Sequence, residues 1–503
     1  MISKTRAYTL VGLEGIPVTV EVDINNGLPA FDIVGLADTA VKESKERVRS
    51  AIKNSGFKVP TRKITANLAP ADVKKEGSLL DVALAVGVLK ATAQLVGEVN
   101  EYVFLGELSL DGELRRVNGV LPIIISALSQ GYKNFIIPKT NEREASFVEG
   151  VNVYPANNLK EIINHLSGLT LIEKVKTQTF VSADAKNKYD SDLSLVKGQA
   201  VAKRALEIAV AGGHNMLFVG APGTGKTMLA KCIPTIMPDM TFEEALETTK
   251  IHSVAGYVKE GEGIIYKRPF RSPHHTASTV SLTGGGQSLR PGEISLAHNG
   301  VLFLDEMPEY KRSTLEALRQ PLEDGVITVA RVTGSVTYPA NVILCGSMNP
   351  CPCGNYGSSE RECTCTPTQI AKYRAKLSGP LLDRIDIQVE VDSVKYAELS
   401  SEEQSETSAV VRERVNRARA IQRERFKDEQ ILTNSDMGEK HIKKYCPLSE
   451  DCENILKNAY VTLKLSPRAR SRIIKVARTI ADMSASESIR PEHILEAVSY
   501  RRY

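Results

Sequence analysis

The stretch Met216–Thr227 limits the folds available to this chain more than any other part of the sequence. Met216–Val219 is an apolar run typical of a buried strand, and the segment after Thr227 has the apolar pattern of a helix. Between them, GAPGTGKT matches the pattern G-x-x-x-x-G-K-[ST]. In this setting the N–H groups of the loop and the N-terminus of the helix converge on phosphates. We therefore predict a parallel-sheet α/β domain with a phosphate-binding P-loop.

The P-loop is a predicted site for ATP and Mg²⁺. Lys226 can reach the β- and γ-phosphates, and the Thr227 hydroxyl is a candidate Mg²⁺ ligand. The residues predicted to bind the nucleotide are Gly220, Ala221, Pro222, Gly223, Thr224, Gly225, Lys226, Thr227 and, further along the chain, Asp305.

Two further apolar strands lead into polar residues. Val301–Leu304 ends in Asp305 and Glu306, which is typical of a Walker-B strand. We predict that Asp305 holds Mg²⁺ and that Glu306 polarises the attacking water. Val342–Cys345 leads to Asn349, which is predicted to orient that water.

Composition excludes several classes of protein. Hydrophobic residues make up 42% of the chain and charged residues 25%, which is ordinary for a globular protein. The longest apolar runs fall well short of the ~20 residues that span a bilayer, and the N-terminus lacks the pattern of a secretory signal. We expect a cytoplasmic protein with no membrane partner. Eight cysteines are few for a disulfide framework and favour a reducing compartment.

The 503 residues are expected to form several domains. Residues 1–168 mix strand-like and helix-like stretches, and 169–192 are polar and weakly periodic, as in a linker. Residues 193–396 alternate strands and helices, and 397–503 have helical patterns throughout.

Four cysteines are clustered in a loop rich in Gly, Ser and Pro. Cys351 and Cys353 form one C-x-C pair, and Cys363 and Cys365 form another. Four thiolates suffice for a closed, structural Zn²⁺ site. The pairs are tighter than the usual C-x₂-C, so free loop cysteines remain the alternative.

The order of these motifs resembles that of AAA+ ATPases. The resemblance implies that Asn349 is sensor 1, that Arg384 in LLDRID (381–386) is an arginine finger, and that Arg468 in SPRA (466–469) is sensor 2. An arginine finger reaches the γ-phosphate held by a neighbouring subunit. The resemblance therefore implies a ring, with a homo-hexamer expected.

Several stretches are similar to the magnesium-chelatase-like ATPases called YifB or ComM. They are RPFRSPHH (268–275), RPGEISLAHNG (290–300), GSMNPCPCG (346–354) and GPLLDRID (379–386). The resemblance covers essentially the whole chain. It implies a DNA helicase that drives branch migration during natural transformation, with recombination proteins as further partners. Magnesium chelatases share the ATPase core, so a chelatase-type motor acting on a partner protein is the alternative. No role is assigned to His274 and His275.

The N-terminal segment resembles the protease domain of Lon, which has a ribosomal-S5-like α+β fold. The similar stretches are EGSLL (76–80) and GELSLDGEL (106–114). The resemblance places Ser78 at the nucleophile and Leu121 at the position of the catalytic lysine. Because leucine cannot accept a proton, we predict no protease activity and interpret Ser78 as a helix cap. An ATP-dependent protease is therefore disfavoured, and the domain is expected to support the ring or contact DNA.

Two features bear on DNA binding independently of any resemblance. The pattern of Val326–Tyr338 predicts a hairpin with its turn at Thr333-Gly334. The alternative is that these residues simply extend the sheet. Arg412–Lys427 carries seven basic and two acidic residues, and Lys464–Arg478 carries six basic and no acidic ones. Such surfaces attract phosphates, but charge runs are commonly just solvated helix faces. We interpret the chain as an ATP-driven DNA motor.

Overall fold

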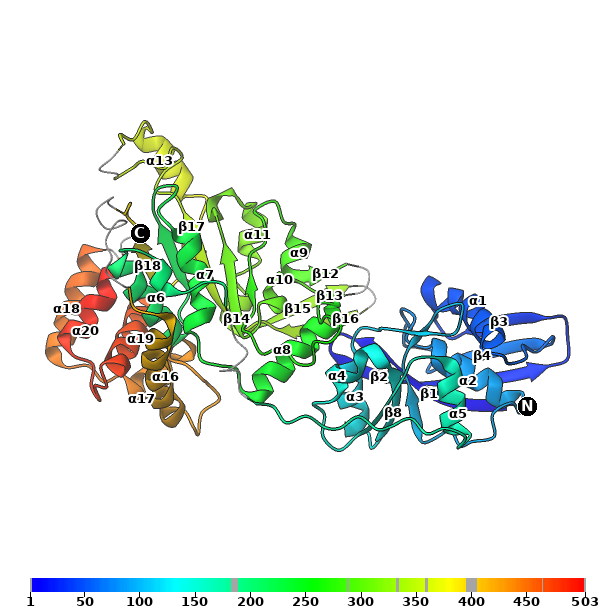
Figure 1. Ribbon diagram of the computed structural model, residues 1–503. Helices are drawn as coiled ribbons and strands as arrows, with labels where there is room; N and C mark the ends of the chain where they lie inside the picture. The colour runs from blue at the N-terminus through cyan, green and yellow to red at the C-terminus, as the bar shows by residue number, and fades with distance from the viewer. Residues whose placement is uncertain are drawn as a thin grey trace.

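The computed structural model describes residues 2–181, 189–286, 289–331, 334–357, 361–394, 405–463 and 465–501. An N-terminal domain lies at one end, a parallel-sheet core in the middle and a bundle of helices at the other end (Figure 1). The α/β P-loop core, the mixed N-terminal domain and the helical C-terminal region expected from the sequence are all confirmed.

The N-terminal domain is built on a seven-stranded mixed sheet in the order β3-β4-β2-β1-β5-β8-β9. Val18, Val20 and Val22 alternate with more exposed residues on β2 and are buried, as the pattern predicts. The strands are β1 (Ile2–Val11), β2 (Glu14–Asn25), β3 (Ala30–Val34), β4 (Lys63–Ala69), β5 (Tyr102–Phe104), β8 (Asn134–Pro138) and β9 (Asn152–Ala156), with a small ribbon of β6 (Glu107–Leu108) and β7 (Leu114–Arg115). The helices are α1 (Thr39–Asn54), α2 (Asp81–Ala91), α3 (Val120–Ser129), α4 (Glu142–Ala145) and α5 (Leu159–Leu166).

A connecting segment joins the N-terminal domain to the core. Residues 169–181 and 189–192 are irregular, and the rest of the predicted linker lies outside the described residues. The chain is nevertheless held at both ends. Val175 donates its backbone N–H to Val153 on β9, and the ring of Phe180 stacks on Tyr266 of the core with centroids 5.3 Å apart.

The core is a five-stranded, all-parallel sheet in the order β11-β14-β17-β10-β18. Its central strands are continuous apolar runs, because a parallel sheet is covered by helices on both faces. The strands are β11 (Phe270–Arg271), β14 (Gly300–Leu304), β17 (Val342–Met348), β10 (Met216–Val219) and β18 (Ile387–Glu390). The larger helices around it are α6 (Ala200–Gly212), α7 (Lys226–Ile236) and α8 (Phe242–Ala255).

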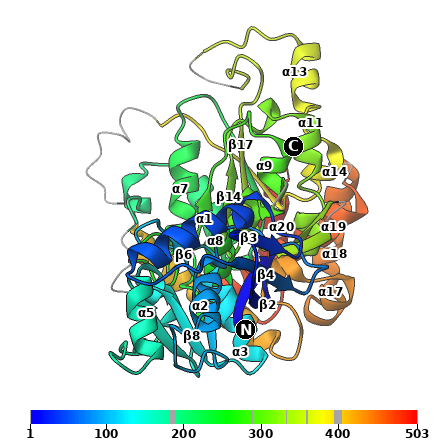
Figure 2. The same cartoon turned by 90° about the vertical axis from the view of Figure 1, so that its right-hand side faces the viewer.

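Shorter elements are inserted between the core strands. The predicted hairpin is present, with β15 (Val326–Arg331) paired to β16 (Gly334–Pro339) in antiparallel register, and Thr333 of its turn lies outside the described residues. The others are α9 (Thr279–Thr283), β12 (Gly284–Gly285), β13 (Arg290–Pro291), α10 (Glu293–Leu296), α11 (Arg312–Glu316), α12 (Pro321–Asp324), α13 (Pro367–Arg374) and α14 (Gly379–Leu382). Helix α13 projects at the top of both ribbon views, away from the N-terminal sheet (Figure 2).

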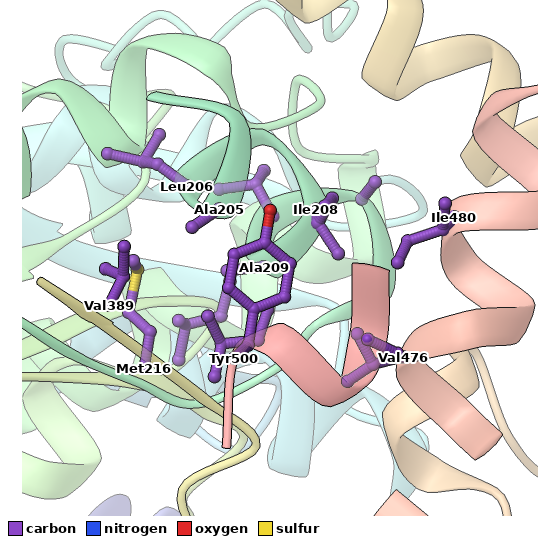
Figure 3. Close-up of a cluster of buried hydrophobic side chains, with 14 of the residues drawn as sticks. Ala205, Leu206, Ile208, Ala209, Met216, Val389, Val476, Ile480 and Tyr500 are labelled. Carbon is purple, nitrogen blue, oxygen red and sulfur yellow. The ribbon is translucent and has the colours of Figure 1, made fainter. Parts of the chain in front are cut away.

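The C-terminal helices share one hydrophobic core with the parallel sheet. Val476 and Ile480 of α19 and Tyr500 pack toward the α6 residues Ala205–Ala209 (Figure 3). The helices are α16 (Ser408–Arg425), α17 (Glu439–Tyr445), α18 (Glu450–Thr462), α19 (Pro467–Met483) and α20 (Pro491–Ser499). The interface between the helical region and the core is therefore apolar and buried.

A buried ion-pair network also joins the helices to the sheet. The Asp386 carboxylate, just before β18, accepts a hydrogen bond from Arg472 of α19 and lies 3.3 Å from Nδ1 of His214. Nε2 of His214 lies 2.8 Å from the hydroxyl of Thr479. Burial alone would raise the pKa of Asp386, but Arg472 and His214 hold it well below its usual value.

We expect Asp386→Ala to lower the free energy of unfolding by about 3–5 kcal/mol, because it leaves the Arg472 charge without its partner in a largely buried site. Since the folded-state pKa of Asp386 is depressed, its contribution is present above the ordinary aspartate pKa and is lost only as the pH falls below it. Thermal unfolding followed by circular dichroism measures the loss. Asp428→Ala, at an exposed acid with no assigned partner, is the control, and an equal loss there would contradict the assignment.

Among the described residues, no helix has the length and apolar character needed to cross a bilayer.

Candidate nucleotide-binding site

The P-loop joins the end of β10 to the start of α7. Gly223 and Gly225 have φ angles of +83° and +90°, which L side chains rarely adopt. No atom lies within 4 Å of a Cβ built on either glycine, so the space in front of both is open. Gly225 is also the N-cap of α7, whose amide groups point into that space without a side-chain cap. The loop therefore has the shape of an anion cradle.

Lys226 lies across the mouth of this cradle. Its Nζ donates to the carbonyl oxygens of Gly220 at 2.7 Å and Ala221 at 2.8 Å, and it lies 3.4 Å from Oδ1 of Asn349. Burial lowers the pKa of Lys226, although Asp305 and Glu306 oppose this shift. An ammonium group held by neutral carbonyls near two carboxylates is well placed to exchange these contacts for phosphate oxygens.

Thr227 and Asp305 meet where the sequence predicts a Mg²⁺ site. The Thr227 hydroxyl donates to Oδ2 of Asp305 at 3.0 Å. These hard oxygen ligands are the kind that Mg²⁺ uses beside phosphates, so the residues present fit the ion. The geometry brings P-loop and Walker-B residues together from β10 and β14.

Ser347 is a functional candidate that was missed at the level of sequence. Its hydroxyl donates to Oδ1 of Asp305 and accepts from the backbone N–H of Glu306 at 3.2 Å. Ser347 is fully buried on β17, which lies between β14 and β10. Oδ1 of Asp305 thus accepts from Ser347 and from the backbone N–H of Glu306, while Oδ2 accepts from Thr227. A polar residue inside the apolar run VILCGSM was the available signal.

Glu306 has an unusual backbone conformation. Its φ of +52° places it in the left-handed region, which is uncommon for a residue with a side chain. The side chain is 56% exposed, and its Oε2 lies 3.6 Å from Nδ1 of His275. The ring of His275 lies against that of His274, with centroids 4.1 Å apart and the ring planes tilted by 33°. The histidine pair that had no role in the sequence therefore borders the predicted catalytic carboxylate.

Two cavities lie at the predicted site, one beside the P-loop and one beside Glu306. One is lined by residues of the loop together with Lys197, Gln199, Met228, Cys353, Asn355 and Arg361, and has a volume of about 490 Å³. The other lies between Glu306, Asn349 and the α13 residues Lys372 and Tyr373. The first, which is lined by the P-loop, is the candidate nucleotide cavity, and the second borders the predicted catalytic carboxylate Glu306.

Arg384 and Arg468 lie in a different cluster. The Arg384 side chain is 8% exposed, pairs with Glu323 of α12 and donates to the carbonyls of Arg319 and Pro380. Hydrogen bonding to Arg384, together with the charges of Arg468 and Arg472, lowers the pKa of Glu323. Arg468 is exposed at the start of α19. Three cations thus gather around one carboxylate, apart from the P-loop contacts described above.

The basic helices of the C-terminal region are largely engaged within the chain. On α16, Arg414 pairs with Glu207 and Glu406, and Arg425 pairs with Asp482. On α19, Arg470 pairs with Glu453, and Arg472 pairs with Asp386. Lys464 of the predicted basic run lies outside the described residues. These basic side chains form ion pairs within the chain, so the charge runs give little support for DNA binding.

The interpretation of Ser78 as a helix cap is wrong. Helix α2 begins at Asp81 with Leu80 as its N-cap, and the Ser78 hydroxyl donates instead to the carboxylate of Glu107 on β6. The backbone carbonyl of Ser78, and not its hydroxyl, accepts from the N–H of Asp81 at 3.3 Å. Leu121 is buried at the start of α3.

Family models match nearly all of the chain. The model described as "Magnesium chelatase, subunit ChlI" matches residues 192–399, "Subunit ChlI of Mg-chelatase" matches 20–141, and "Magnesium chelatase, subunit ChlI C-terminal" matches 405–501. The P-loop and all five core strands lie within the first of these.

Two relatives match over essentially their whole length. YifB of Escherichia coli is 44% identical over 502 residues, which are 99% of this chain and 96% of the relative. The competence protein ComM of Haemophilus influenzae is 43% identical over 499 residues, 98% of this chain and 96% of the relative. A partial match is the probable DNA helicase MCM9 of Arabidopsis thaliana, 25% identical over 178 residues, 35% of this chain and 22% of that protein.

We expect Ser347→Ala to weaken Mg²⁺-dependent nucleotide binding by about 10- to 100-fold, as is usual when a group that orients a metal ligand is removed. Titration of Mg²⁺ against a fluorescent ATP analogue measures the effect. Ser281→Ala, at an exposed serine on α9, is the matched control. An unchanged Mg²⁺ requirement in Ser347→Ala would show that Asp305 does not need this contact.

Proposed function

Because the chain belongs to the YifB/ComM family of magnesium-chelatase-like AAA+ ATPases, we propose that it is a ring-forming motor that uses ATP hydrolysis to move DNA strands. The observation that carries the ATPase part is the convergence of Lys226, Asp305, Glu306 and Asn349 at one edge of the parallel sheet. Ligands of open α/β sheets bind at this edge, beyond the carboxyl ends of the strands.

Each side chain at this edge has a separate proposed role. Lys226 binds the β- and γ-phosphate oxygens, and the P-loop amides hold the rest of the triphosphate. Mg²⁺ bound by Thr227 and Asp305 supplies neutralising charge on the phosphates. The Glu306 carboxylate accepts a hydrogen bond from the attacking water and orients it, and Asn349 positions that water from the opposite side.

The cluster around Glu323 supports the proposal of a ring. Within one protomer the guanidinium of Arg384 contacts Glu323 and two backbone carbonyls. None of these contacts involves the P-loop of the same protomer. Glu323 is 57% exposed, which places the cluster at the surface. A neighbouring nucleotide would compete with Glu323 for Arg384, since a bidentate guanidinium binds phosphate well. This is the basis for proposing Arg384 and Arg468 as groups that act between subunits of a homo-hexamer.

The DNA part of the proposal is supported by relatives and by the hairpin. One full-length relative is named a competence protein, and a partial relative is named a probable DNA helicase. In the hairpin, the exposed face of β15 and β16 carries Thr328 and Thr337, and the exposed Arg331 lies at the end of β15 next to the turn. Its other face, with Ile327 and Tyr338, is buried in the core. We propose that the exposed face contacts a DNA strand and that the motor drives branch migration in recombination during natural transformation, alongside recombination proteins.

We expect Lys226→Ala to abolish nucleotide binding and Glu306→Gln to bind ATP but hydrolyse it at least about 100-fold more slowly, because only the second variant keeps the phosphate contacts. ATP affinity and phosphate release are measured on both. Glu260→Gln, at an exposed carboxylate that lines neither cavity, is the control. Normal turnover by Glu306→Gln would rule out this residue as the base.

We expect Arg384→Ala to reduce turnover by about 10³-fold or more while leaving ATP affinity nearly unchanged, as for other arginines supplied to a phosphoryl group in trans. The decisive measurement mixes Arg384→Ala with Glu306→Gln. Each protomer then keeps one of the two groups, so mixed rings recover activity. Absence of recovery, together with normal ATPase in a strict monomer, would contradict the shared site.

DNA and chelatase functions are separated by what stimulates the ATPase. Three-stranded and four-way DNA junctions should raise turnover and be resolved into products by the DNA motor. The family models named for a magnesium chelatase subunit favour the second candidate, a motor acting on a partner protein. In that case porphyrin-binding partners, and not DNA, would stimulate hydrolysis. Labelling of Ser78 by a fluorophosphonate would revive a protease function.

A further inference from the structure

The four clustered cysteines converge on one point in the structure. Their Sγ atoms all lie within 4.8 Å of one another. Cys351 lies 3.4 Å from Cys353 and 3.7 Å from Cys363, and Cys353 lies 3.6 Å from Cys363. In a tetrahedral ZnS₄ site with Zn–S bonds of about 2.3 Å, the sulfur atoms are about 3.8 Å apart. The observed spacing is close to that value.

The distances between the sulfur atoms also distinguish a metal site from disulfide bonds. A disulfide bond is about 2.05 Å long, which is far shorter than any of these distances, and all four cysteines are free. The backbone N–H of Tyr356 donates to Sγ of Cys351 at 3.3 Å, a contact that stabilises thiolate ligands. Neighbouring thiolates repel one another unless a cation lies between them. The arrangement is therefore that of a closed four-thiolate metal site.

The loop that carries the cysteines forms part of both cavities at the predicted site. It begins at Cys351, two residues after Asn349. Pro352 lines the cavity next to Glu306, whereas Cys353, Asn355 and Arg361 line the nucleotide cavity. The loop has little apolar contact of its own, because only Cys351 and Gly354 of residues 351–357 are buried. Its position must come from something other than a hydrophobic core.

Gly354 is the point at which the loop touches the P-loop. Its φ is +83°, and a Cβ built on it would lie 2.6 Å from Cδ of Pro222. Nothing larger than glycine fits between the two loops. Gly357 has a nearly identical φ of +79°, but no atom lies within 4 Å of its Cβ position. The two glycines share a backbone conformation, but only the buried Gly354 touches the P-loop.

We propose that Cys351, Cys353, Cys363 and Cys365 bind one structural Zn²⁺ ion, and that this ion fixes the cysteine loop against Pro222 so that the nucleotide cavity has a wall. The coupling to nucleotide rests on the proposed ATPase function, whereas the metal site stands on its own geometry. With the ion bound, Arg361 is held at the lining of the nucleotide cavity. Without it, the loop must be ordered when the nucleotide binds, and this entropy weakens binding.

The test uses the purified full-length chain, with metal content measured by mass spectrometry and binding of a fluorescent ATP analogue measured with Mg²⁺. The parent should contain one zinc per chain. Cys363→Ser/Cys365→Ser should lose the zinc and bind the analogue about tenfold more weakly or worse. Cys446→Ala, at a buried cysteine of the helical region, should keep both properties. Absence of zinc from the parent, or iron in its place, would overturn the proposed ion.

Two glycine variants test the coupling even if the cysteine variant folds poorly. Gly354→Ala should retain zinc but weaken analogue binding about tenfold, since the added methyl group displaces the loop from Pro222. Gly357→Ala carries the same backbone strain without the clash and should bind like the parent. Equal affinities of the two glycine variants would overturn the role of the loop as a wall. Zinc content does not depend on DNA or on ring formation. The zinc measurement can therefore be interpreted even if the protein proves not to be a DNA motor.

Discussion

The parallel pairing of β17 with both β14 and β10 is the constraint on which the candidate site depends. The register sets Leu304 beside Gly346 and Val219 beside Met348, so the three strands end at one edge of the sheet. The backbone N–H of Gly220 donates to Met348 at 3.2 Å, which ties the start of the P-loop to the last residue of β17. Without this register, neither Ser347 nor Asn349 would lie near the Walker residues.

Close packing leaves little freedom in this arrangement. A Cβ on Gly346 would lie 2.2 Å from the sulfur of Met307, and one on Gly220 would lie 2.2 Å from the carbonyl oxygen of Val391. A side chain at Gly220 would clash with fixed backbone, whereas one at Gly346 would require the Met307 side chain to move. The rigid edge that results allows Asp305, Lys226 and Asn349 to stand within hydrogen-bonding distance of their partners before any ligand arrives.

The sheet is also joined mechanically to the domains at either end. The helical region shares a hydrophobic core with α6 and is locked by the Asp386 ion pairs. On the other side, the N–H of Gly119 donates to the hydroxyl of Ser253 on α8, and that hydroxyl donates to Glu144. A Cβ on Gly12, in the β1–β2 turn, would lie 2.3 Å from Val336 of the hairpin. The N-terminal domain thus touches the element proposed to contact DNA.

The sequence was a good guide to those parts of the chain whose chemistry is local. The P-loop, the Walker-B strand and the α/β class follow from short patterns, because phosphate binding needs glycines and a lysine at fixed spacing on a strand–loop–helix unit. The strand Met216–Val219 and the hairpin were located within a few residues for the same reason. The P-loop contacts of Lys226 and Thr227 also follow this local geometry.

Contacts between distant segments were decided only by the tertiary structure. Ser347 looked like part of an apolar strand, and His275 had no partner in the sequence, until strand order placed them beside Asp305 and Glu306. The Ser78 hydroxyl donates to Glu107 instead of capping a helix. Basic residues of α16 and α19 form ion pairs with carboxylates from other elements. Charge and hydrogen-bonding capacity are properties of a residue, whereas the partner that satisfies them depends on which segments the fold brings together.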